Sequence, residues 1–334
     1  MNQRTARFFL VSWGAALAAA LALLGCAAPA GAPHREPLAD RVRASAKDAS
    51  MNLRAFPEPA GGVSRFLVAG HVYGTIQGDD RLPAKTLLDQ MPALGQLNLR
   101  MLVSLGDMVK HSETEDFDLL DELLLQPAAY PVFNTVGNHD VENRALYEER
   151  YGPTYFSFRD MSSWFIFLDT EREVCSIDAP QQEMLAQALE AALAEDEVRQ
   201  IFIFMHKTLF FKNERLFGLK KEIAGPNVWD CYNTGNFAQI LARLIEPAAQ
   251  QKPVYLFAGD VGAYGNLSPY YERRSDLPLT MVMTGIGEFP TDSAILVTVD
   301  DGDVRMEVYP LAGQAPEPLE NYSPEYWIRR AGPN

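Results

Sequence analysis

Short apolar segments alternate with helical patterns along most of the chain, and this alternation is the feature that most restricts its fold. The segments with strand length and strand composition are 65–70, 101–106, 130–137, 164–169, 201–206 and 254–259. Helical spacing of apolar residues is found at 83–90, 117–125, 181–196 and near 236–245. From residue 279 onward only strand patterns follow, with a hairpin turn predicted at Asp301-Gly302. The order predicts an α/β fold in which two facing mixed β-sheets are covered by helices.

The first 25 residues are typical of a targeting segment and are left out of the fold. Arg4 and Arg7 form a basic head, residues 8–24 are apolar, and the segment ends in Leu23-Leu24-Gly25-Cys26. This ending resembles a bacterial lipobox, which would make Cys26 the lipidated first residue of the mature protein. We therefore expect a lipoprotein on the periplasmic face of the cell envelope, held at the membrane by its lipid anchor only; plain secretion is the alternative. Residues 26–62 are predicted to form a tether and an N-terminal helix.

Charge and cysteine content restrict the partners and the compartment. The formal net charge is −15 and no basic run is present, which argues against nucleic acid binding. Two cysteines, Cys175 and Cys231, follow the targeting segment. In an oxidising periplasm they can form a disulfide; two separate buried thiols are the other reading.

Residues that commonly bind metals follow five of the predicted strands. They are His71, Asp107, the Asn138-His139-Asp140 stretch, His206 and Asp260. In α/β folds the loops after strand carboxyl ends carry the reactive side chains. A single such residue is usually a cap or a turn residue, but five at the ends of neighbouring strands predict a metal site. Imidazole and carboxylate ligands suit Mn, Fe or Zn, and the oxygen ligands also suit Mg.

Three of these motifs resemble those of the calcineurin-like metallophosphoesterases. They are Gly106-Asp107, Gly137-Asn138-His139-Asp140 and the lone His206 that ends an apolar strand. Tyr155-Phe156-Ser157-Phe158 and the strand after it are also similar to that family. The resemblance covers about 64–311. It implies a four-layer α-β-β-α sandwich, with a metallophosphoesterase-like domain at 63–311 and a C-terminal tail at 312–334.

Two motifs depart from the family pattern, and they exchange ligand types. His71-Val72-Tyr73 replaces the family's D-x-H, and Gly259-Asp260-Val261-Gly262 replaces G-H-x-H. The resemblance implies one metal held by Asp107, Asn138, His206 and Asp260. For a second metal it leaves only His71, Asp107 and a doubtful Tyr73, with no ligand at Gly262. We therefore expect one firmly bound divalent ion, with His71 completing its shell, and a second ion that is weak or absent.

The resemblance also implies roles for the residues beside the metal ligands. His139 matches the histidine that protonates the leaving oxygen or steadies the phosphoryl charge, and Asp140 would orient its ring. Lys207 either pairs with a phosphate or is solvated. Glu288 either reaches the site or caps a turn.

These observations favour a metal-dependent phosphoric ester hydrolase. Its substrate would be a phosphorylated small molecule or an envelope glycoconjugate. A binding or assembly lipoprotein on a degenerate phosphoesterase fold, serving surface polysaccharide export, is the alternative. A third hypothesis keeps the metal but changes the bond that is cut, to a carboxylic ester or an N-acetyl group.

Overall fold

The protein is described by a computed structural model that covers residues 38–75, 81–210, 231, 235–261, 268–313 and 316–330. These residues belong to one compact unit, Pro37–Asn334. Cys26 with the expected targeting segment, and Gly262, lie outside the described residues. Within the described ranges, the helices are all too short or too polar to cross a bilayer.

The first sheet has five strands in the order β11-β10-β1-β2-β3. Their bounds are β1 (Ser64–Ala69), β2 (Met101–Ser104), β3 (Val132–Asn134), β10 (Ser293–Asp300) and β11 (Asp303–Pro310). The first three run parallel, and β10 is antiparallel to β1. β10 and β11 form the hairpin predicted around Asp301-Gly302, with Asp300 opposite Asp303.

The second sheet has six strands in the order β4-β5-β6-β7-β9-β8. Their bounds are β4 (Phe156–Asp160), β5 (Ser163–Phe167), β6 (Gln200–Met205), β7 (Val254–Ala258), β8 (Tyr270–Arg273) and β9 (Leu279–Met283). The four inner strands are parallel, and the edge strands β4 and β8 are antiparallel to their neighbours. The sheet is therefore mixed, as expected.

The two sheets face each other across a core rich in phenylalanine. Phe66 of the first sheet lies edge-on to Phe165 and Phe202 of the second, with ring centroids 5.5 and 5.1 Å apart. Edge-to-face packing at this distance is favoured by the ring quadrupoles. Both faces of the inner strands are buried, which explains why they read as continuous apolar runs rather than as alternating patterns.

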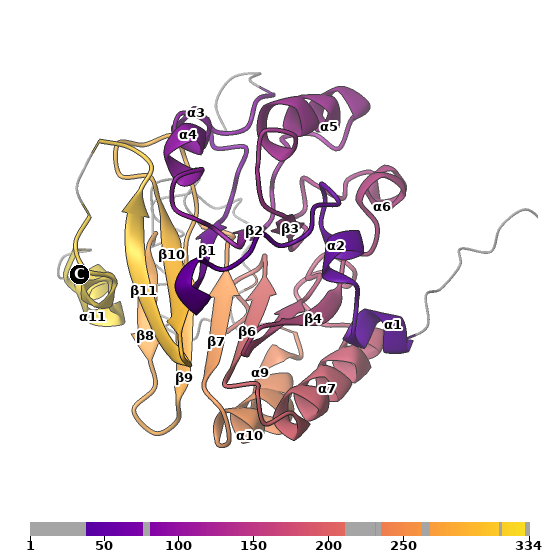
Figure 1. Ribbon diagram of the computed structural model, residues 1–334, viewed down its shortest axis with the longest axis vertical. Coiled ribbons are helices and arrows are strands. Elements are labelled where there is room, and N and C mark those ends of the chain that lie inside the picture. Colours follow the sequence, from indigo (N-terminus) through magenta and orange to yellow (C-terminus); the bar gives the residue numbers. More distant parts are fainter. Residues whose placement is uncertain are drawn as a thin grey trace, which may run out of the picture. The chain divides into compact units, whose positions relative to one another are not determined.

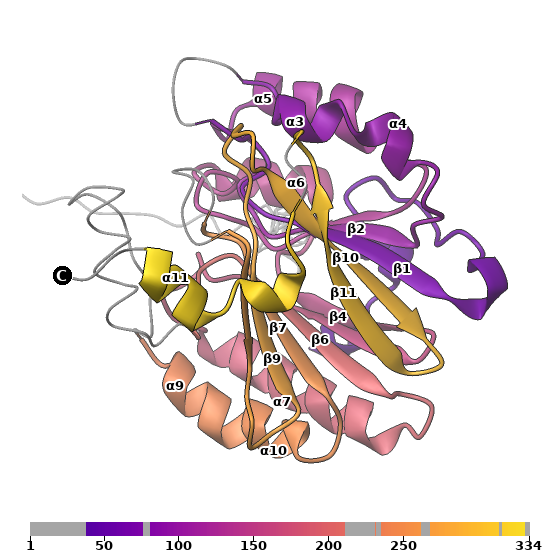
Figure 2. The ribbon, with the colours of Figure 1, turned by 90° about the vertical axis from the view of Figure 1, so that its left-hand side faces the viewer.

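Helices cover the outer face of each sheet, so the expected four layers are present (Figures 1 and 2). On the first sheet they are α3 (Lys85–Leu88), α4 (Met91–Leu94), α5 (Thr114–Leu120), η2 (Asp121–Leu125) and α6 (Arg144–Tyr151). On the second they are α7 (Ala179–Ala194), α9 (Phe237–Ile240), η3 (Leu241–Ile245) and α10 (Glu246–Ala249). A disulfide joins Cys175, in the loop between β5 and α7, to Cys231, so the paired reading of the two cysteines is confirmed.

Segments on both sides of 63–311 pack onto the sandwich. The N-terminal helix expected within 26–62 is present as two short helices, α1 (Leu38–Val42) and α2 (Ala46–Ala49). Ser50 adopts an extended conformation that ends α2, and an extended segment and η1 (Ala60–Gly62) follow. The expected C-terminal tail contains η4 (Leu319–Asn321) and α11 (Pro324–Arg330). Trp327 of α11 is buried and its Nε1 donates to the Pro269 carbonyl at 3.1 Å. These terminal segments therefore form part of the compact unit.

Candidate metal centre

The carboxyl ends of strands from both sheets meet at one edge of the sandwich. His71 follows β1, Asp107 follows β2, His206 follows β6 and Asp260 follows β7. Backbone hydrogen bonds tie these ends together, from His71 N to Gly106 O at 3.1 Å and from Asp260 N to His206 O at 2.9 Å. The fold therefore brings together side chains that are far apart in the sequence, with a separation of 189 positions between His71 and Asp260 (260 − 71).

Asp107, His206 and Asp260 form a compact cluster in which one ligand atom from each lies within 4.8 Å of the others. His206 Nε2 is 3.5 Å from Asp107 Oδ2 and 3.7 Å from Asp260 Oδ1. Asp107 and His206 are buried, whereas the Asp260 side chain keeps 20% of its surface exposed. The cluster is therefore enclosed on the protein side and reachable from solvent along Asp260.

The His206 ring is oriented as a metal ligand. Its Nδ1 lies 2.7 Å from the Leu105 carbonyl, which can only accept, so Nδ1 carries the hydrogen. Nε2 is completely buried and has no hydrogen-bond partner, although two carboxylates face it. Burial by itself would lower the pKa of His206, but the charge of Asp107 raises it above its ordinary value. The surroundings thus attract positive charge at Nε2, and one imidazole with two carboxylates fits a divalent ion.

Asp107 is held in this position by an unusual backbone. Its φ is 54°, in the left-handed region that non-glycine residues rarely adopt, and Gly106 before it has a φ of 91°. A Cβ on Gly106 would collide with His206 Nδ1, and one on Gly137 would collide with Asp107 Oδ1. Burial tends to raise the pKa of Asp107, but His206 and other neighbouring cationic groups lower it below its ordinary value. The carboxylate is therefore ionised, as a ligand must be.

His71 lies beside the cluster rather than within it. Its Nε2 is 3.8 Å from Asp107 Oδ2, and burial lowers its pKa to about 4, so the ring is neutral at pH 7. The ring packs on Tyr73 with centroids 4.2 Å apart, and Tyr73 packs on His139 at 4.9 Å. Tyr73 therefore fills the space between the two histidines where the family pattern would place a metal-binding histidine.

Asn138, the remaining expected ligand, has a different partner in the structure. Its Oδ1 accepts a hydrogen bond from Lys207 Nζ at 2.7 Å. The Lys207 side chain is only 5% exposed, so the expectation that it is solvated is wrong. The sequence could show that Lys207 follows His206, but not that partners on three other loops enclose its ammonium.

The structure gives both nitrogens of His139 a partner and corrects the role expected for Asp140. His139 Nδ1 donates to the Lys110 carbonyl at 2.7 Å, which orients the ring, and Nε2 accepts a hydrogen bond from the Tyr73 hydroxyl at 3.4 Å. The buried Asp140 carboxylate instead accepts hydrogen bonds from backbone amides of 107–109 and of Gly137. It cannot orient the His139 ring because its oxygens point into the loop after β2. The His139 side chain is 29% exposed, at the rim of the centre.

Glu288 caps a helix. Its Oε1 accepts from the backbone amide of Lys85, the first residue of α3, at 2.8 Å. A carboxylate at this end satisfies a backbone donor that has no partner within the helix. Of the two readings of Glu288, the structure supports the cap.

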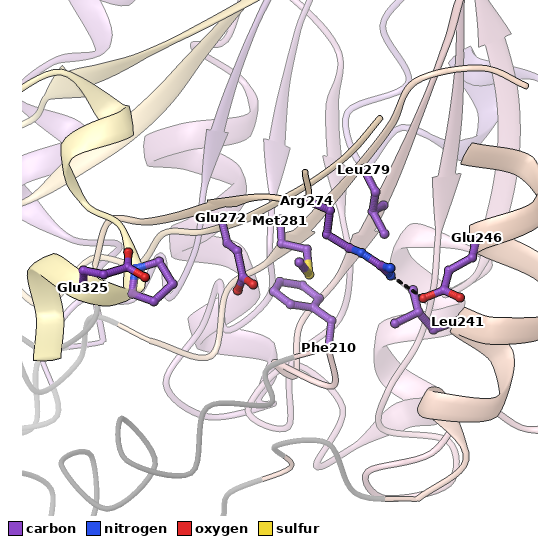
Figure 3. Close-up of a pocket in the computed structure, with 9 residues that line it drawn as sticks. Phe210, Leu241, Glu246, Glu272, Arg274, Leu279, Met281 and Glu325 are labelled. Carbon is purple, nitrogen blue, oxygen red and sulfur yellow. Dashed lines mark hydrogen bonds and ion pairs between the residues drawn. The ribbon is translucent and has the colours of Figure 1, made fainter. Parts of the chain in front are cut away.

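A separate pocket of about 570 Å³ lies on the outer side of the second sheet (Figure 3). It is lined by residues of β8, β9, η3, α10 and α11 together with Phe210, which lies in its middle beside Met281. Three of its charged residues have partners: Arg274 pairs with Glu246, and Glu272 accepts from the Tyr270 hydroxyl. Among the described residues that line it, none is a histidine. The cluster of Asp107, His206 and Asp260 therefore remains the candidate site.

The fold is similar to the folds of solved structures. A dimetal phosphatase from Danio rerio superposes with a TM-score of 0.52 and 13% sequence identity, over 75% of this chain and 96% of that one. Vps29 from Chaetomium thermophilum superposes with a TM-score of 0.30 and 11% identity, over 75% of this chain and 99% of that one. Neither a protein-family profile nor the sequence of a curated protein matches this chain. The chain thus has the fold of a dimetal phosphatase, and the resemblance to calcineurin-like metallophosphoesterases is confirmed as a resemblance of fold.

Proposed function

We propose that the protein is a metal-dependent phosphoric ester hydrolase. The observation that carries the proposal is the buried, unpartnered His206 Nε2 facing Asp107 and Asp260 at 3.5 and 3.7 Å. Asp107 and Asp260 both face this nitrogen, and the Lys207 ammonium pairs with Asp260 only, so the centre keeps negative charge that a divalent ion would balance. The phosphatase fold supports phosphorus chemistry at this place.

Each residue of the centre has a role in this proposal. Asp107, His206 and Asp260 would hold a divalent ion of the Mn, Fe or Zn type. When bound, such an ion supplies Lewis-acid polarisation of a phosphoryl oxygen and activation of water. His139 would give a proton from Nε2 to the leaving oxygen, since its Nδ1 is fixed on the Lys110 carbonyl. Its position at the exposed rim is suited to a leaving group that extends into solvent.

We further propose that the hydrolase acts on the periplasmic face of the cell envelope as a lipoprotein. The support is the basic head, apolar run and Leu-Leu-Gly-Cys ending of the first 26 residues. The disulfide fits an oxidising compartment. The substrate would then be a phosphorylated small molecule or an envelope glycoconjugate.

The test combines metal content with hydrolysis. Protein produced with Mn, Zn and Fe supplied should contain about one ion per chain and hydrolyse p-nitrophenyl phosphate or bis(p-nitrophenyl) phosphate. Asp107→Ala and Asp260→Ala should reduce metal content to a similar extent, because each removes one of three ligands. Asp89→Ala is the matched control, since Asp89 is exposed and pairs with Lys85.

The Tyr73 stack favours one competing function. Because Tyr73 occupies the space where a second metal ligand would lie, the fold could serve as a binding or assembly module without catalysis. Wild-type protein with well under one ion per chain would overturn the hydrolase proposal in favour of this one.

A further inference from the structure

Lys207 places a positive charge inside the centre. Its Nζ donates to Asn138 Oδ1 at 2.7 Å and lies 3.2 Å from Asp260 Oδ2 and 3.9 Å from Glu171 Oε1. These partners come from three different loops, after β3, β7 and β5. One amide oxygen and two carboxylates around Nζ are the surroundings that an ammonium requires. Lys207 therefore brings a positive charge into the folded centre.

The partners of this ammonium are themselves a cation-binding set. An amide oxygen and two carboxylate oxygens are ligands that hard divalent ions accept. Asp260 is shared: its Oδ1 faces His206 Nε2, and its Oδ2 faces Lys207 Nζ. The centre thus has two neighbouring cation positions, one among Asp107, His206 and Asp260 and one already occupied by Lys207.

We propose that Lys207 is a resident cation that takes the place of a second metal ion, so that this centre binds a single divalent ion. Asp107, Asp260 and Glu171 carry three negative charges, which one ammonium and one divalent ion neutralise. A second divalent ion would leave the buried centre with an excess of positive charge, which a low dielectric makes costly. His71, whose Nε2 is 3.8 Å from Asp107 Oδ2, is in ring contact with Tyr73.

The assignment rests on the proposed function, because it specifies how a phosphoryl-binding centre keeps its positive charge. A fixed ammonium beside the metal position stabilises developing negative charge without any reorganisation. It also explains why Asn138 need not be a metal ligand: its amide oxygen holds the ammonium.

Mn²⁺ binding to the metal-free full chain tests the assignment by calorimetry and elemental analysis. Wild type should bind one Mn²⁺ per chain. Lys207→Met keeps the bulk but removes the charge, so it should bind one Mn²⁺ at least about tenfold more tightly. Lys207→Ala also opens the space beside Asn138, Glu171 and Asp260, and a second ion would leave it one excess positive charge rather than the two of wild type, so it should bind two. If Lys207 only oriented Asp260, both variants would bind Mn²⁺ more weakly, because removing an outer partner weakens a metal ligand.

Lys252→Met is the matched control. Lys252 Nζ donates to the carbonyls of Ala192 and Glu195, both at 2.7 Å, at the end of β7 opposite to Asp260. Its Mn²⁺ binding should equal that of wild type. Two Mn²⁺ ions per wild-type chain would overturn the assignment, and this result does not require that either Lys207 variant folds. Folded Lys207 variants that bind Mn²⁺ no more tightly than wild type would also overturn it. All of these measurements record Mn²⁺ binding. A failure to hydrolyse phosphate esters would therefore count against the proposed function and not against the role assigned to Lys207.

Discussion

At the scale of single residues, the centre is built from side chains at the first turn after a strand. His71 and Asp107 both adopt left-handed backbone conformations there, with φ of 52° and 54°. Such conformations cost of order 1–3 kcal/mol each and persist only where the surroundings enforce them. Here they turn the imidazole and the carboxylate toward each other, with Nε2 and Oδ2 3.8 Å apart. Six other described non-glycine residues also have a positive φ, so this strain supports the proposed site only together with the cluster of metal-binding side chain types.

Removal of the His139 imidazole should separate catalysis from metal binding. His139 touches the centre through its backbone amide, which donates to Asp107 Oδ1 at 3.2 Å, so a side-chain truncation leaves that bond intact. We expect His139→Ala to keep its metal but to hydrolyse p-nitrophenyl phosphate about 100-fold more slowly or worse. Tyr73→Phe, which removes only the hydroxyl near Nε2, should leave the metal content unchanged. Full activity of His139→Ala would show that another group protonates the leaving oxygen.

The sequence predicted which residues gather at the centre better than it predicted their partners. Strand ends and spacing were sufficient to bring His71, Asp107, His206 and Asp260 to one edge. They could not show that Lys207 is buried, because the partners of its ammonium, Asn138, Glu171 and Asp260, come from three separate loops. Nor could they show that Asp140 points away from His139, because adjacent residues in a turn can face opposite sides.

At the scale of elements, Asp140 ties the loop after β2 to the loop after β3. Its carboxylate accepts from four backbone amides and from Asn134 Nδ2, all of them buried. Asp140→Ala would leave these donors without an acceptor, at about 1–3 kcal/mol for each one that stays unsatisfied. We expect the free energy of unfolding in urea to fall by about 3 kcal/mol or more.

Two variants make the result on Asp140 interpretable. Asp140→Asn keeps one acceptor oxygen and should lose less stability than Asp140→Ala. Glu142→Ala removes a carboxylate from an exposed side chain and should change stability by less than about 0.5 kcal/mol. Equal stabilities of Asp140→Ala and Glu142→Ala would mean that water satisfies the amides and that the loops do not depend on this carboxylate.

The inner strands were predictable because burial on both faces makes them uniformly apolar, as in β5 and β6. The elements that sequence reasoning missed are amphipathic or short. β8 is a four-residue edge strand with an exposed end. α6 has eight residues, of which four are charged, one is alanine and one is leucine besides Tyr147 and Tyr151. Tertiary contacts, rather than local pattern, hold such elements in place.

At the scale of the whole molecule, the proposed lipid anchor would determine where the proposed hydrolase meets its substrate. If Cys26 carries the lipid, Cys26→Ser should move the protein from the membrane fraction to the soluble periplasmic fraction, because the described helices cannot span a bilayer. Cell fractionation with immunoblotting measures this. An unchanged membrane fraction would count against lipidation, and equal hydrolysis by both forms after solubilisation would show that the anchor affects location only.

The disulfide links two described residues that are far apart in the sequence. Cys175 and Cys231 are 56 residues apart, and the segment between them contains α7 and β6, which pack on the outer face and in the middle of the second sheet. Closing a loop of this length removes conformational freedom from the unfolded chain, which corresponds to about 4 kcal/mol in the chain-entropy treatment. The double variant Cys175→Ser/Cys231→Ser should therefore unfold in urea with a free energy lower by about that amount. Dithiothreitol should destabilise wild type and leave the double variant unchanged. Equal midpoints for oxidised wild type and the double variant would show that the cross-link does not restrict the unfolded chain, or that strain in the folded state cancels its effect.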